Sequence, residues 1–179
     1  MAKNWKIRKD LSIEVYGHTL FRIECTQDFK EIKAGTLGGF IEKEENLDGN
    51  AWVSDDAQVY GDAWVYGNAR VYGNAWVSGD AQVYGDAQVY GNAWVSGDKI
   101  TNKDDICYIS NRYYNITITP LHIKIGCQYH AQEAWWNFTN EQIKKMDGDD
   151  AVNFWKIWKE PLKQICDAIK KEKGEDDVK

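Results

Sequence analysis

The chain of 179 residues lacks the features that assign a sequence at once to a membrane or disulfide-rich class. No run approaches the ~18 uninterrupted apolar residues of a membrane-spanning helix, and no apolar segment of a signal peptide follows the basic N-terminus. The four cysteines are scattered without a C-x-x-C pair, so a dense disulfide framework is excluded. We therefore expect a cytoplasmic protein with reduced thiols and no membrane contact.

An excess of positive charge is also missing. The chain has 28 acidic and 22 basic residues, a formal net charge of −6, and residues 50–98 hold six acids and one base. Proteins bind DNA or RNA strongly where basic side chains displace the counterions of the phosphates. We therefore expect no extended nucleic acid among the partners.

A repeat of six residues fills the middle of the chain. Eight hexads follow one another from Asn50 to Gly97, each with Ala second and Val fourth, and the degenerate hexads GGFIEK and EENLDG precede them. Ala and Val are two residues apart and so share one face of a short strand. Gly with Asn or Asp tolerates the left-handed backbone angles of a sharp corner. The pattern predicts a coil of short parallel strands.

This pattern resembles the hexapeptide repeat of left-handed parallel β-helices. The resemblance implies three hexads in each triangular coil, with residues 18 apart stacked at about the spacing of paired strands. It also implies the left hand of the coil and a threefold assembly, so we expect a homotrimer. With TLGGFIEKEENL before the repeat and IKIGCQYHAQEAWW after it, the layout is similar to phage and prophage proteins of unassigned role.

The expected fold is mainly β: a left-handed parallel β-helix of about three coils, with an N-terminal β-hairpin cap and a C-terminal α+β module. The hairpin is predicted by LSIEVYGHTLFRIECT, which alternates on both sides of Tyr16-Gly17-His18. The expected parts are the hairpin cap (1–37), the β-helix (38–103), the α+β module (104–171) and a disordered tail (172–179).

The C-terminal module is predicted to be a sheet followed by helices. ICYIS, NITIT and LHIKI read as strands. Thr139 with Gln142 forms a capping box for a short helix, and Asp149 or Asp150 caps a longer one that reaches about Lys171. Pro161 should kink this helix. Its apolar stripe is expected to be core or a subunit contact: Trp155, Trp158, Leu162, Ile165, Cys166 and Ile169.

Large aromatic side chains point outward from the expected coil. One face carries Arg70 with Tyr72 and Tyr90, the second carries Trp76 over Trp94, and the third carries Trp64 with Tyr66 and Tyr84. Trp, Tyr and Arg dominate binding energies at interfaces, so we predict that these residues bind a ligand or a partner. Aromatic ladders that only cover the walls of the coil are the alternative.

Two of these side chains suggest a ligand. Trp76 and Trp94 can stack on a nucleobase, while Arg or Lys from the terminal parts meets its phosphates in a pocket between subunits. At one corner of the coil Asp62, Asp80 and Asp98 stack, and three such carboxylates repel one another unless solvated or bridged by a cation such as Ca²⁺. They are weak candidates for a metal site, because each Asp can instead close its own turn. We expect no cofactor.

The resemblance also implies two types of enzyme with this coil, and both use histidine. The resemblance to the carbonic anhydrase type would require three zinc-binding histidines, and the acyltransferase type a catalytic one, whereas the three histidines lie outside the repeat. Both types are disfavoured. Cys127, His130 and Glu133 are the alternative catalytic group, as a thiolate with its base or as part of a metal site. The structural alternative is that Cys127 is a buried residue at the end of a strand and that His130 lies near the start of a helix.

The favoured hypothesis is a non-catalytic phage-type binding protein in the host cytoplasm. It sequesters a small nucleotide-like ligand or blocks a host protein, in particular a component of host defence. This step rests on the resemblance, because a fold does not specify a function. The alternative is an acyltransferase- or hydrolase-like enzyme that uses Cys127 and His130.

Overall fold

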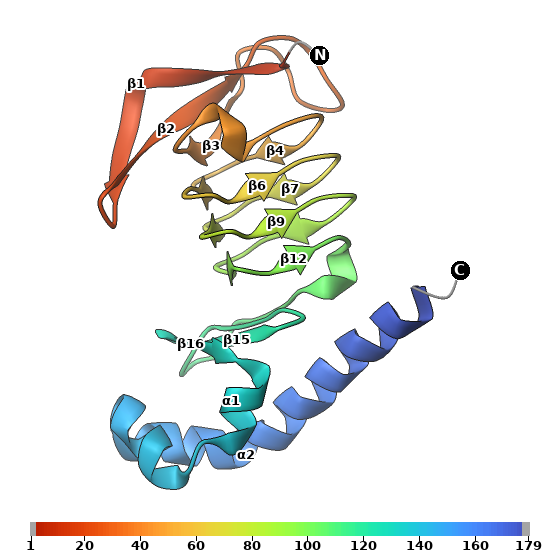
Figure 1. Ribbon diagram of the computed structural model, residues 1–179. Helices are drawn as coiled ribbons and strands as arrows, with labels where there is room; N and C mark the ends of the chain where they lie inside the picture. The colour runs from red at the N-terminus through yellow and green to blue at the C-terminus, as the bar shows by residue number, and fades with distance from the viewer. Residues whose placement is uncertain (1–2, 177–179) are drawn as a thin grey trace.

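The repeat forms a β-solenoid of about three turns, in which short strands stack in three parallel columns (Figure 1). The computed structural model describes residues 3–176. The mainly β fold and the stacking of residues 18 apart are confirmed, since Trp94 pairs with Trp76 and Gln88 with Arg70. The left hand of the coil stays a prediction.

Each column is one wall of the solenoid. The hairpin wall is β3 (Leu37–Ile41), β5 (Gln58–Val59), β8 (Trp76–Ser78) and β11 (Trp94–Ser96). The loop wall is β4 (Trp52–Val53), β7 (Arg70–Val71) and β10 (Gln88–Val89). The ladder wall is β6 (Trp64–Val65), β9 (Gln82–Val83) and β12 (Lys99–Ile100), preceded by the 3₁₀ turn η1 (Glu44–Asn46). A second 3₁₀ turn, η2 (Lys103–Asp105), follows the last coil.

The interior is built from the Ala and Val of the hexads, as predicted. From Ala51 to Val95 these side chains are at most 1% exposed. Ile41 pairs with Val59 and Leu47 bridges to Val65, so the two degenerate hexads do form the first turn of the stack. Burial of these apolar side chains stabilises the solenoid, with the larger Ile41, Leu47 and Ile100 in the first and last turns.

Glycines turn the corners because the next coil lies directly behind them. Gly67 has φ +72°, and a β-carbon there would lie 3.1 Å from the backbone nitrogen of Gly85. An L side chain at this corner would meet both backbone strain and a close contact. The conformation and the stacking of coils therefore both favour glycine.

The N-terminal hairpin extends the hairpin wall. Strands β1 (Trp5–Val15) and β2 (His18–Cys25) pair antiparallel, and β2 pairs antiparallel with β3. The pairing shifts between Arg8 and Ser12, where β1 bulges. Figure 1 shows the result: the first half of β1 lies across the end of the stack, and its second half runs down beside the coils.

The C-terminal module begins with a four-stranded antiparallel sheet. Its strands are β13 (Cys107–Ile109), β14 (Ile116–Ile118), β15 (His122–Ile125) and β16 (Gln128–Ala131). The first three match the predicted strands. The short strand β16 and the helix α1 (Gln132–Asn137) were not predicted, because four residues after a turn carry too little alternation to be recognised.

The long helix α2 (Asn140–Asp176) is interrupted at Asp147 and Gly148, whose backbone angles are not helical. It therefore consists of the predicted short helix and the predicted long one. Thr139 and Gln142 form the capping box, with bonds of 2.9 and 3.2 Å in the two directions. Pro161 lies inside the second part of the helix, and the kink expected there stays a prediction.

The apolar stripe of α2 packs against the sheet as core, because Leu162 and Cys166 are at most 1% exposed and cluster with the isoleucines of β14 and β15. The helix continues to Asp176, so it is longer than predicted and takes in residues 172–176 of the expected disordered tail. Residues 177–179 lie outside the described residues. Within 3–176, no helix combines the length and apolarity needed to cross a membrane.

Candidate ligand groove

A groove of about 1010 Å³ runs along the hairpin wall, between the tip of the hairpin and the C-terminal sheet. Small-molecule sites of proteins are commonly concave, with volumes of about 300–1,000 Å³ and aromatic linings. Six aromatic side chains line this one: Tyr16, Tyr60, Trp76, Trp94, Tyr113 and Tyr114. The groove is formed within one chain, whereas the sequence suggested a pocket between subunits.

Trp76 and Trp94 are brought together by the register of the coil. Both occupy the third position of a hexad and pair across β8 and β11, with ring centroids 5.2 Å apart and planes at 56°. The indole nitrogen of Trp94 donates to Ser78 Oγ at 3.2 Å, which fixes the orientation of that ring. Both rings are half-buried, so part of each faces the groove.

Tyr16 is a third ring at the same place, and the sequence did not predict it. It occupies the turn between β1 and β2, and its ring centroid lies 5.5 Å from Trp76 and 6.5 Å from Trp94. The signal in the sequence was an aromatic residue before Gly17 in a tight turn, where Asn or Asp is usual. Docking of the hairpin on the wall could not be foreseen from this local pattern.

Lys124 provides positive charge in the groove. Its Nζ lies 4.6 Å from the centre of the Trp94 ring and donates to the carbonyl of Gly126. Burial lowers the pKa of Lys124 from its ordinary value, and a neighbouring Cys127 opposes this change. Among the described lining residues there is no Asp or Glu. Although the protein is acidic overall, the groove therefore favours a ligand with an anionic group.

The alternative catalytic residues do not form a dyad in the described structure. Cys127 is exposed in the turn after β15, where its Sγ accepts from Gln128 Nε2 at 3.6 Å. His130 Nε2 lies 3.3 Å from Gln128 Oε1, and burial lowers the pKa of His130. Glu133 is an exposed residue of α1. Cys127 also lines the groove, so the thiol lies at the same site as the Trp pair.

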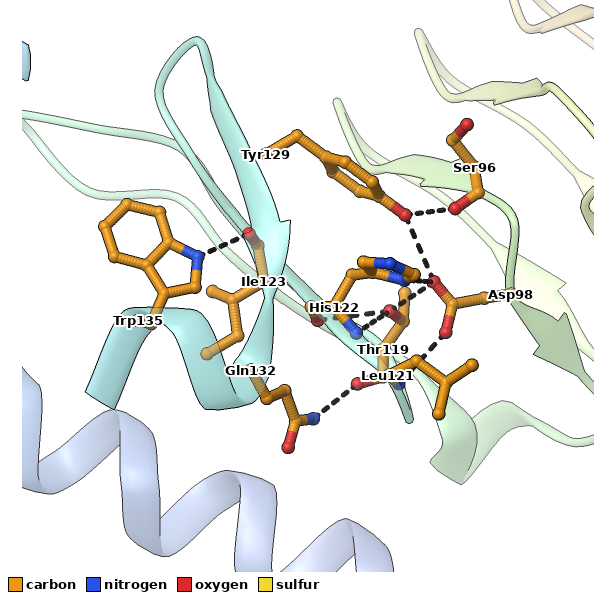
Figure 2. Close-up of polar contacts among 9 residues, drawn as sticks. All are labelled: Ser96, Asp98, Thr119, Leu121, His122, Ile123, Tyr129, Gln132 and Trp135. Atoms are coloured by element: carbon orange, nitrogen blue, oxygen red, sulfur yellow. Dashed lines mark hydrogen bonds and ion pairs between the residues drawn. The ribbon is translucent and has the colours of Figure 1, made fainter. Parts of the chain in front are cut away.

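The three stacked aspartates differ from one another. Asp62 is exposed and pairs with Lys43 at 2.9 Å, and Asp80 is exposed. Asp98 is completely buried and accepts bonds from the C-terminal sheet (Figure 2). Among the described residues, no group of three or more His, Cys, Asp or Glu side chains is placed to hold a metal ion.

Asp98 joins the last coil to the C-terminal sheet. Its carboxylate accepts from Thr119 Oγ1 at 2.8 Å, the Leu121 amide at 3.0 Å, and Tyr129 OH at 3.2 Å. His122 Nδ1 lies 2.7 Å away, and because an ionised carboxylate only accepts, this nitrogen carries the hydrogen. Figure 2 shows these donors around one side chain. The cluster fixes the sheet, and with it Lys124, relative to Trp94.

The other predicted binding residues lie outside the groove. Arg70 forms an ion pair with Glu31 of the N-terminal loop, and Tyr72 stacks on Tyr90 with centroids 5.8 Å apart. On the ladder wall the rings form a continuous stack, with centroids 4.0 Å apart from Trp64 to Tyr66 and 4.8 Å apart from Tyr66 to Tyr84. Trp64 is 40% exposed at one end of it.

The repeat resembles a known β-solenoid family. A family model described as the YdcK β-solenoid repeat matches residues 57–69, 63–79, 81–97 and 87–100. The match covers most of the coils and less than half of the chain, so the similarity is one of the repeat. No curated protein matches the chain.

Proposed function

We propose that the protein is a non-catalytic binding protein whose ligand site is the groove of the hairpin wall. The observation that carries this proposal is the convergence of Tyr16, Trp76 and Trp94 with Lys124 from three separate parts of the chain. Stacking on aromatic side chains binds nucleobases with little selectivity, and an ammonium group attracts a phosphate. A small nucleotide is therefore the ligand class that fits the groove best.

The test is calorimetric titration with ribonucleoside monophosphates and their 3′,5′-cyclic forms. The double variant Trp76→Gln, Trp94→Gln removes the stacking surface, and it should fold because Gln58, Gln82 and Gln88 occupy the same hexad position. Loss of a stacking ring costs about 1–3 kcal/mol per base, so we expect at least a tenfold weaker affinity. Trp64→Gln is the matched control on the ladder wall.

Binding of no nucleotide by the wild-type protein would contradict the proposal. Equal affinity of the wild type and the double variant would place the ligand elsewhere. Cys127→Ser distinguishes the enzyme hypothesis from the binding hypothesis. This variant should leave nucleotide binding unchanged. Loss of a catalytic activity in this variant, with folding preserved, would instead favour the hydrolase- or acyltransferase-like hypothesis.

A homotrimer is proposed as the assembly, with the ladder wall as its contact surface. The hairpin covers part of the first wall, and the loop that carries Phe29 and Glu31 covers part of the second at Trp52 and Arg70. On the third wall Trp64 is exposed. Native mass spectrometry of the wild type and of Trp64→Gln tests this: we expect a trimer that the substitution weakens, and a wild-type monomer would contradict it.

The biological setting is proposed from the resemblance in layout. A phage protein that removes a nucleotide signal, or that blocks a host defence protein, in the host cytoplasm would need a binding site of this kind and no catalytic group. Expression of this protein in a host that carries such a defence should then lower the protection that the defence provides. The Trp76→Gln, Trp94→Gln variant should not, if the nucleotide is the target.

A further inference from the structure

The turn at the tip of the hairpin contains a residue type that this kind of turn disfavours. Tyr16 and Gly17 join the paired residues Val15 and His18, and both have positive φ, +48° and +85°. Two-residue turns with positive φ at both positions favour Asn-Gly, because most side chains are strained there. A bulky aromatic residue in this conformation is an outlier, and such strain is often retained at binding sites.

The hairpin does not need the Tyr16 ring to stay on the solenoid. A small apolar cluster holds the hairpin on the wall, where hairpin residues pack against wall residues: Ile13, Val15 and Leu20 against Phe40 and Tyr60. His18 Nδ1 also lies 2.8 Å from Glu42 Oε1 beside the turn. Tyr16 itself is 72% exposed. Burial therefore does not explain why an aromatic ring occupies the strained position.

Tyr16 and the Trp pair form one cluster of rings. The planes of Tyr16 and Trp94 differ by 21° and their centroids are 6.5 Å apart. Trp76 stands across them, at 72° to Tyr16. The three rings therefore lie within contact range of one another, and the exposed ring of Tyr16 extends the aromatic surface of the Trp pair toward the tip of the hairpin.

We infer that Tyr16 is the outer wall of the ligand site, and that the planar base of a nucleotide stacks on the exposed Tyr16 ring beside the Trp pair. This inference rests on the proposed function and names the residue that closes its site. The bulge between Arg8 and Ser12 is where β1 bends, so that its second half brings the tip to the hairpin wall.

Tyr16→Asn tests the role of the ring without weakening the turn. The substitution removes the aromatic wall and creates the Asn-Gly pair that this turn prefers, so the hairpin should remain folded. Tyr16→Phe keeps the ring. Tyr72→Ser is the control on the loop wall, since Ser54, Ser78 and Ser96 occupy the same hexad position.

The measurement is stopped-flow tryptophan fluorescence with the tightest-binding nucleotide of the monophosphate panel, beside urea unfolding of each variant. We expect Tyr16→Asn to weaken affinity by about 5- to 150-fold, with most of the change in the dissociation rate, since an outer wall retains a bound ring. Tyr16→Phe and Tyr72→Ser should match the wild type. If Tyr16→Asn unfolds more readily than the wild type, Tyr16→Gly replaces it, because glycine adopts positive φ without strain.

The outcomes separate the two proposals. If the wild type binds a nucleotide and a folded Tyr16 variant binds it with the same affinity, the role of Tyr16 is overturned. The groove then remains the site. Tighter binding by that variant overturns this role too, and shows that the tip only obstructs the Trp pair. Failure of the wild type to bind any nucleotide overturns both proposals.

Discussion

Removal of the Asp98 carboxylate should detach the C-terminal sheet from the last coil. In Asp98→Ala the hydroxyls of Thr119 and Tyr129 keep other acceptors, the carbonyls of His122 and Ser96. The Leu121 amide and His122 Nδ1 lose the partner that the structure records. A buried donor without a partner costs about 1–3 kcal/mol, and both of these donors are only part-buried, with the His122 side chain 24% exposed to water, so we expect a total loss of about 1–3 kcal/mol.

Urea unfolding and amide hydrogen exchange measure this effect. Exchange should accelerate at Leu121 and His122 before it does in the coils, because the junction opens locally. Asp98→Asn should lose less, since its amide oxygen can still accept. Asp62→Ala is the matched control at the same corner, with a side chain 87% exposed, and should change stability by less than about 0.5 kcal/mol. Equal losses at the two aspartates would refute the reasoning.

Two further predictions concern the corners and the thiols. Gly67→Ala should destabilise the protein by about 1–2 kcal/mol from backbone strain, with an added loss from the contact at 3.1 Å, whereas Gly35→Ala meets only the strain at φ +85° with no atom within 4 Å. Urea midpoints check the difference, and equal midpoints would contradict it. A thiol reagent at neutral pH should modify the exposed Cys127 first, and a bulky adduct there should block nucleotide binding. Cys166 should react last, because burial raises its pKa to about 12 and leaves little thiolate; peptide mapping that finds Cys166 modified first would contradict this.

The solenoid could be predicted because each position in it depends on a local pattern. Ala and Val recur every six residues, so the register that stacks Trp76 on Trp94 follows from counting alone. The hairpin and three strands of the C-terminal sheet follow from alternation in the same way. These are all features for which a few neighbouring residues determine the backbone.

The site could be predicted only in part, because it is completed by contacts between distant segments. Asp62 and Asp98 occupy equivalent hexad positions, yet one is exposed and the other is buried beneath a sheet that begins nine residues later. Likewise, the sequence identified Trp76 and Trp94 but gave no reason to place Tyr16 or Lys124 against them. These contacts depend on how the two terminal parts dock onto the coil, and no local sequence pattern determines that docking.

The most direct test of a nucleotide site in the groove is mass spectrometry of the small molecules released on denaturation. Wild-type protein and the Trp76→Gln, Trp94→Gln variant are purified side by side from the same cells, with Trp64→Gln as the control. We predict a nucleotide released from the wild type and from Trp64→Gln, and none from the double variant. Release of the same nucleotide in equal amount from all three would contradict the account.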